Sequence, residues 1–153
     1  MVVFVFGGLL ALLVAVAAYV RLAPSDPGRW NVATGAVGAS GEVVAGEVVA
    51  GEVVAGEGWA RLWLPSGTAR GLLAGLDAVA LATPRTTRLA GSVEEGRITW
   101  ITRSALWGFP DYTTAEARAD GLFIYARLRF GTGDMGVNAE RLRVWQKELS
   151  GQE

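Results

Sequence analysis

Residues 122–130 decide the fold, and they read LFIYARLRF. In a β-strand successive side chains point to opposite faces, so one face of this stretch would be apolar. The other face would carry aromatic side chains together with Arg127 and Arg129. Asp120 and Gly121 stand directly before the stretch, and an Asp-Gly pair is typical of a tight hairpin turn. These residues therefore predict a half-buried antiparallel strand.

Three further segments upstream have the composition of strands. They cover residues 86–93, 98–104 and 112–118, and short turns rich in polar residues or glycine separate them. The first two are joined by Glu-Glu-Gly, and the second is rich in β-branched and aromatic residues. Together with residues 122–130 they predict a four-stranded antiparallel sheet.

Two stretches with helical spacing enclose the predicted strands. After Ser66, a plausible N-cap, apolar residues recur at the i, i+4, i+7 and i+8 positions until Pro84 ends the pattern. The second stretch begins near Asn138, a good N-cap residue, and its Leu142 and Trp145 would face inward. Both helices would pack on the apolar sheet face. The expected fold is a two-layer α+β sandwich with two flanking helices.

The N-terminal run is strongly apolar. Residues 2–20 contain no charged side chain, and about 20 apolar residues are enough to cross the hydrocarbon layer of a bilayer. We therefore expect one transmembrane helix over residues 1–22 that precedes the sandwich and remains attached as a single-span anchor. A cleaved signal peptide is the alternative, because residues 15–17 read AVA, a small-x-small pattern.

A repetitive segment follows the predicted anchor. Residues 41–57 read GEVVAGEVVAGEVVAGE, and a five-residue period keeps no single face apolar in either a helix or a strand. Residues 23–57 are therefore predicted to be a low-complexity linker, although the Val-Val pairs could instead extend a sheet edge. Residues 58–153 would form the α+β domain.

The composition excludes several kinds of chemistry. The 153 residues include no histidine and no cysteine, which removes disulfides, thiolate or imidazole metal ligands and histidine-based nucleophile systems. The formal net charge of −1 gives no reason to expect nucleic acid binding. We expect neither a cofactor nor a metal, and a non-catalytic role is favoured over an enzyme.

Two motifs in the predicted domain resemble a known family. Residues 103–111 read RSALWGFPD, and residues 127–138 read RLRFGTGDMGVN. An Arg-Ser pair leading into Gly-Phe-Pro-Asp, followed by Arg-x-Arg-x-Gly leading into Asp-x-Gly-x-Asn, resembles the family known as domain of unknown function 1499. The resemblance covers roughly residues 60–149. It implies an envelope protein attached to the bacterial inner membrane, with the domain on the periplasmic side, whereas the few charges near the anchor favour the cytoplasmic side.

The polar residues of these motifs permit three interpretations. The candidates are Arg103, Asp111, Arg127, Arg129, Asp134, Asn138 and Arg141. The first interpretation is a structural network, in which arginines bind carboxylates and fix two loops against the sheet. The second is a binding site for a carboxylate, a phosphate or an anionic lipid headgroup. The third is an acid/base pair of Asp111 and Asp134, as in glycoside hydrolysis.

Trp107 and Phe109 are the best candidates for an exposed contact, because they stand in a loop beside Gly108 and Pro110. The leading hypothesis is thus a membrane-anchored, non-catalytic domain that belongs to a membrane protein complex and contacts it near these aromatic residues. An anionic ligand or lipid headgroup domain is the alternative, and an enzyme using the two aspartates ranks last.

Overall fold

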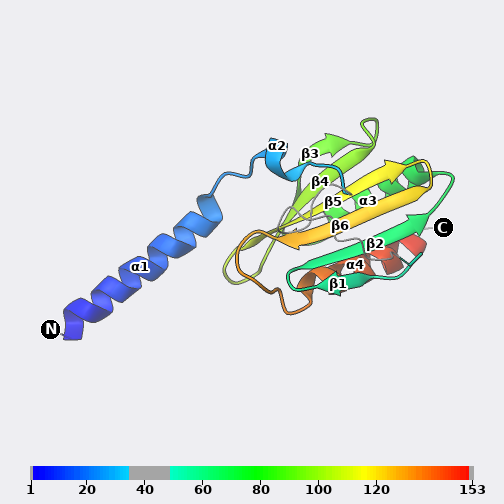
Figure 1. The fold of residues 1–153 in the computed structure, drawn as a ribbon. Helices are drawn as coiled ribbons and strands as arrows, with labels where there is room; N and C mark the ends of the chain where they lie inside the picture. Colours follow the sequence, from blue (N-terminus) through cyan, green and yellow to red (C-terminus); the bar gives the residue numbers. More distant parts are fainter. Residues whose placement is uncertain (1, 35–48, 152–153) are drawn as a thin grey trace.

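The computed structural model describes residues 2–34 and 49–151, with side chains from residue 6 onward (Figure 1). The elements are α1 (Val2–Leu22), α2 (Pro27–Trp30), β1 (Val54–Gly56), β2 (Trp59–Pro65), α3 (Ala69–Ala82), β3 (Thr86–Ser92), β4 (Arg97–Arg103), β5 (Pro110–Arg118), β6 (Gly121–Leu128) and α4 (Val137–Ser150). The first copy of the five-residue repeat and part of the second, residues 41–48, lie outside the described residues.

The sheet has six strands in the order β1-β2-β6-β5-β4-β3, and every neighbouring pair is antiparallel. The prediction of a four-stranded sheet is therefore wrong. The four predicted strands exist as β3 to β6, but β2 pairs along the whole of β6 on its other side. The short strand β1, formed by the end of the repeat, then pairs with β2 through Val54 opposite Arg61.

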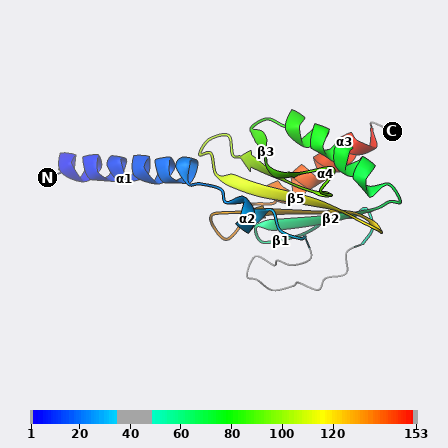
Figure 2. The ribbon, with the colours of Figure 1, turned by 90° about the horizontal axis from the view of Figure 1, so that it is seen from above.

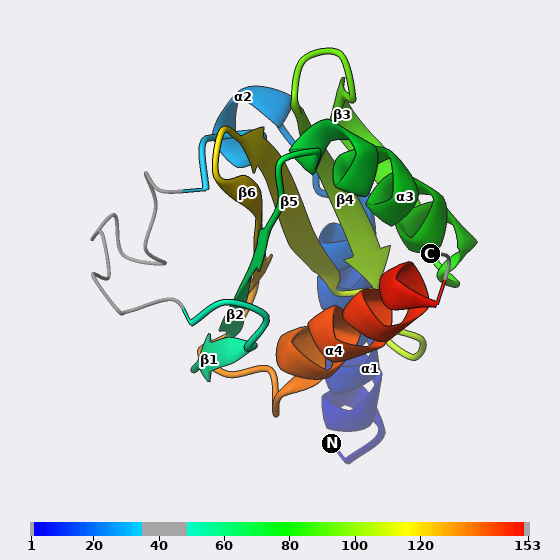
Figure 3. The same ribbon diagram turned by 90° about the vertical axis from the view of Figure 1, so that its right-hand side faces the viewer.

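Helices α3 and α4 cover one face of the sheet (Figure 3). The alternation in β6 places its leucine, isoleucine and alanine on this face as predicted, and Leu122 and Ala126 are fully buried there. From the helices, Leu73, Leu76 and Trp145 fill the same core. The N-caps differ from the prediction. Thr68 and Gly136 precede the helices, whereas Asn138 lies inside α4.

A third, thin layer covers part of the opposite face. It consists of residues 23–34, which we call the strap, and includes the single turn of α2 (Figure 2). Trp30 lies flat on Tyr112 of β5, with ring centroids 3.9 Å apart and planes 7° from parallel. Asp26 starts the turn by accepting a hydrogen bond from Gly28 N at 2.9 Å. In addition to the two predicted flanking helices, the sheet thus carries a third, α2, on its opposite face.

Residues 2–22 form a helix, α1, that projects from the domain (Figure 1). In the described part of the chain, however, no helix has the length and apolar character needed to cross a membrane. This finding corrects the prediction of a transmembrane helix over residues 1–22.

Candidate functional site

Arg127 does not face an open binding site. It points away from the core because it alternates with Ala126 in β6, and its Nη2 donates a hydrogen bond to Trp30 O at 2.9 Å. Its guanidinium lies 5.1 Å from the ring centroids of both Trp30 and Tyr125. The residue is only 5% exposed, and burial lowers the pKa of the Arg127 guanidinium. This charge is thus enclosed between the sheet and the strap.

Arg129 also donates hydrogen bonds to the strap, close to the C-terminal end of α1. Its Nη1 donates to Pro24 O at 3.1 Å and to the Tyr112 hydroxyl at 3.0 Å. The Ser25 Oγ lies 2.7 Å from the same hydroxyl. The two arginines that were candidates for anion binding therefore hold backbone carbonyls of the strap, which satisfies part of their hydrogen-bonding capacity within the chain.

Glu116 fastens the C-terminal end of the strap. Its Oε2 accepts hydrogen bonds from Thr34 N at 3.1 Å and Thr34 Oγ1 at 3.0 Å, and it also accepts one from Arg118 at 2.7 Å. Its Oε1 accepts from Arg97 at 2.9 Å. Burial opposes ionisation of Glu116, but the bonds from Arg118, Arg97 and Thr34 outweigh it and lower the pKa of this carboxyl from 4.5 to about 2.

The two candidate aspartates serve the packing of α4. Arg141 Nη2 donates to Asp111 Oδ2 at 3.1 Å, and Arg141 Nη1 donates to Asn138 Oδ1 at 2.6 Å. Asp134 accepts from Gly136 N at 3.0 Å and from Asn138 N at 2.8 Å, so both of its oxygens bind the first turn of α4. Burial raises the pKa of Asp111, an effect that Arg141 opposes. These residues form a structural network that ties β5 to α4.

The seven polar candidates thus separate into three places. The network of α4 contains Asp111, Asp134, Asn138 and Arg141, while Arg127 and Arg129 hold the strap. Arg103 belongs to neither group, because its Nη1 donates to Gly108 O at 3.0 Å in the loop after β4. In the described residues, no cluster of acidic side chains is arranged to hold a metal ion.

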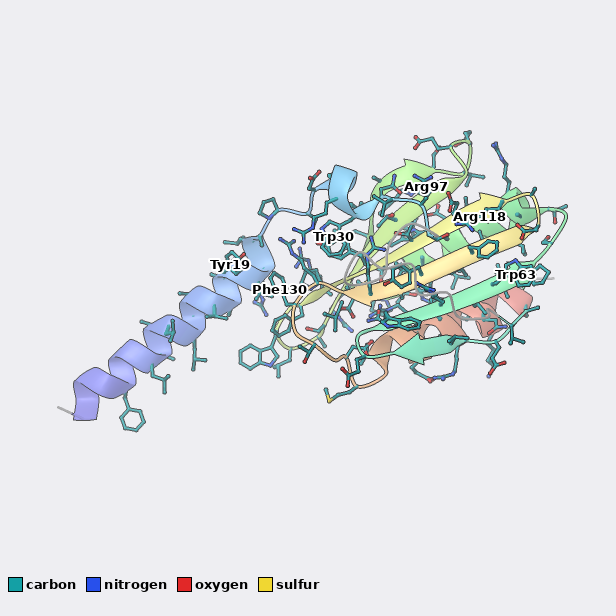
Figure 4. The ribbon with its side chains drawn as sticks, viewed as in Figure 1. Tyr19, Trp30, Trp63, Arg97, Arg118 and Phe130 are labelled. Atoms are coloured by element: carbon teal, nitrogen blue, oxygen red, sulfur yellow. The ribbon has the colours of Figure 1, made fainter. Side chains whose placement is uncertain are left out.

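The loop of residues 104–109 lies against the end of α1. Arg21 Nη2 donates to Leu106 O at 3.0 Å, and its Nε donates to Trp107 O at 3.3 Å. Phe109 packs on Phe130, which in turn meets Tyr19 of α1 edge-on at 6.0 Å (Figure 4). The Trp107 side chain is 50% exposed. The predicted aromatic contact residues thus lie at the junction between α1 and the domain.

Sequence reasoning missed several residues of this junction and of the strap. They are Trp30, Tyr112, Glu116, Arg97, Arg118 and Arg85. The one local signal was the isolated Trp30 in a polar, proline-containing segment, since a lone tryptophan outside regular structure often packs on a neighbouring surface. Nothing in the spacing along the chain links it to β5.

No model of a known protein family matches the chain, and no curated protein matches it either. The resemblance to the 1499 family therefore stays a prediction.

Proposed function

We propose that the chain is a non-catalytic domain that α1 attaches to a lipid bilayer. The observation that carries the proposal is the surface of α1. From Phe6 to Ala18 its side chains are apolar and nearly all exposed, and this part of the helix has no polar face. A helix that is apolar all round requires an apolar environment on every side. The acyl chains of a bilayer supply one, whereas a groove on a protein covers a single side.

The junction supports the same proposal. The loop of residues 104–109 and the loop after β6 both lie at the end of the domain that faces α1 (Figure 1). They expose Leu106 and Trp107 in the first loop and Met135, which is 100% exposed, in the second. Tryptophan is enriched where proteins meet the membrane interface. A domain held close to a bilayer by α1 would bring these side chains to its surface.

The contacts of the two candidate acids support a non-catalytic role. Asp134 caps α4 with both oxygens, and Asp111 is paired with Arg141. Neither carboxylate is free to act as an acid or base on a substrate. Contacts within the described residues do not bear on the predicted link to a membrane protein complex. Co-purification from detergent-solubilised membranes tests that link.

Flotation with neutral phosphatidylcholine vesicles tests membrane attachment. The full chain should float, and the double variant Leu10→Lys/Leu13→Lys should remain in the dense fraction. Each substitution removes about 2 kcal/mol of apolar burial, which is about thirtyfold in partitioning, before the cost of burying the charge is counted.

The matched control is Leu81→Lys/Val144→Lys, which adds the same charges at exposed apolar positions of α3 and α4. It should float like the unmodified chain, and all three proteins should melt at similar temperatures. Failure of the unmodified chain to float, or equal flotation of both double variants, would overturn the proposal.

A further inference from the structure

A hollow of about 440 Å³ lies beside the C-terminal end of α1, and it is lined by basic and hydroxyl side chains. Arg21 comes from α1, Arg85 from the turn before β3, and Arg103 from the end of β4. Thr87 and Ser104 add hydroxyl groups to the wall. Three arginine residues thus line one hollow, and among the described residues no acidic side chain lines it.

The three arginines differ from five others in the chain, which form ion pairs. Arg88, Arg97, Arg118, Arg141 and Arg143 each pair with a carboxylate. Within residues 6–34 and 49–151, Arg21, Arg85 and Arg103 form no ion pair, and their hydrogen bonds go to backbone carbonyls. A guanidinium has five N–H donors, so each of these residues keeps donors for a ligand. The hollow therefore carries uncompensated positive charge with unused donors.

The backbone holds these side chains in place. Arg85 adopts a positive φ of 59°, which is costly for a residue with a side chain. Its conformation is locked by a reciprocal pair of bonds, because Arg103 N donates to Arg85 O at 3.0 Å and Arg85 Nε donates to Arg103 O at 3.1 Å. Gly108 gives Arg21 its room, since a Cβ there would lie 3.0 Å from Arg21 Cγ and Nε. The hollow is thus formed before any ligand arrives.

We propose that this hollow binds the phosphate group of an anionic phospholipid headgroup. Guanidinium groups match phosphate oxygens through paired N–H donors, and several of them around one site favour an anion. The location selects a lipid over a soluble phosphate, because Arg21 is the last basic residue of the helix that attaches the chain to the bilayer. This inference rests on the proposed membrane attachment and adds a lipid preference to it.

The experiment compares vesicles of pure phosphatidylcholine with vesicles that also contain phosphatidylglycerol, using the full chain. Each arginine near an anionic surface contributes favourable binding free energy. The loss of two arginines should therefore lower the affinity for phosphatidylglycerol vesicles roughly tenfold to thirtyfold. The test variant is Arg85→Gln/Arg103→Gln. Its control, Arg70→Gln/Arg143→Gln, removes the same net charge from exposed positions on α3 and α4. The unmodified chain and the control should prefer phosphatidylglycerol, and the test variant should lose that preference.

A third variant, Gly108→Ala, keeps all three charges but crowds the Arg21 side chain and strains the loop backbone at its φ of 73°, and it should also weaken the preference for phosphatidylglycerol. Equal loss in the control would mean that net charge and not the hollow is responsible, and this would overturn the inference. So would equal binding of the unmodified chain to both kinds of vesicle.

Two further measurements distinguish a lipid headgroup from free phosphate, and the headgroup site from membrane attachment. Inorganic phosphate and short-chain, soluble phosphatidylglycerol are titrated into the full chain in non-ionic detergent, with tryptophan fluorescence as the signal. Saturation by the lipid at much lower concentration than by phosphate supports a headgroup site, and equal affinity overturns the choice of a lipid. If the chain fails to float on neutral vesicles yet binds the short-chain lipid in an Arg85- and Arg103-dependent manner, membrane attachment fails while the headgroup site stands.

Discussion

Glu116 offers the sharpest test of how the strap is held, because one carboxylate joins it to the sheet. Replacing Glu116 with glutamine removes the charge that accepts bonds from Thr34, Arg97 and Arg118. The pKa of this carboxyl falls from 4.5 to about 2 in the folded chain, and at 1.36 kcal/mol per unit that difference corresponds to about 3 kcal/mol. The arginine side chains are 33% and 35% exposed, so solvent screening reduces the expected loss to about 1.5 kcal/mol.

The pH dependence has a definite sign. A depressed folded pKa contributes stability that is fully present above pH 4.5 and is lost as the pH falls toward about 2. We therefore expect the free energies of unfolding of the unmodified chain and of Glu116→Gln to differ at pH 6 and to converge near pH 2. The raised pKa of Asp111 changes stability in both proteins alike and cancels in the difference.

The assay is urea unfolding of the full chain in non-ionic detergent, followed by tryptophan fluorescence between pH 2 and pH 7. The control Glu148→Gln removes an exposed charge from α4 and should leave the unfolding curve unchanged within about 0.5 kcal/mol. A difference between Glu116→Gln and the unmodified chain that stays constant from pH 2 to pH 6 would refute the reasoning.

Two further substitutions test the strap and the network of α4. Trp30→Ala should cost about 3 kcal/mol by removing the ring stacked on Tyr112, and trypsin should then cut faster after Arg29, whereas Trp30→Phe should remain largely protected. Arg141→Ala should cost about 3 kcal/mol in urea unfolding at pH 7, because Asp111 becomes a buried charge without its partner, while Arg143→Ala at an exposed pair should cost less than about 0.5 kcal/mol. Burial already raises the pKa of Asp111, so this carboxyl becomes protonated as the pH is lowered, and the loss of unfolding free energy in Arg141→Ala should then shrink. A loss of unfolding free energy that does not depend on pH would contradict the pairing of Asp111 with Arg141.

The strands that could be predicted are those with a polar side. β6 and β5 alternate between core residues and residues such as Arg127 or Glu116, and this period of two is visible in the sequence. β2 escaped prediction because its outward positions carry Trp59 and Trp63 on either side of Arg61, while its inward positions are also apolar. A strand with one charged residue on its outer face shows only a weak alternation between polar and apolar positions.

The residues of the candidate site could be predicted from the sequence, but most of their hydrogen-bonding partners could not. The motifs led to Asp111 and Arg141, and the structure pairs them, although Asp111 lies just before the predicted strand of residues 112–118 and is the second residue of β5. The partners of Arg127 and Arg129 were not predictable, since they are backbone carbonyls of residues 23–30, which any sequence would provide. A hydrogen bond to a carbonyl about 100 residues away leaves no trace in the spacing of side chains.

The manner in which the strap is fastened determines how the molecule would bear mechanical force. Ser25, Trp30 and Thr34 attach in turn to Tyr112, Thr114 and Glu116, so the strap follows β5 along its length. A pull along α1 is therefore distributed over successive bonds that must shear together. Bonds at a hinge would instead open one at a time, and the domain would swing freely on its helix.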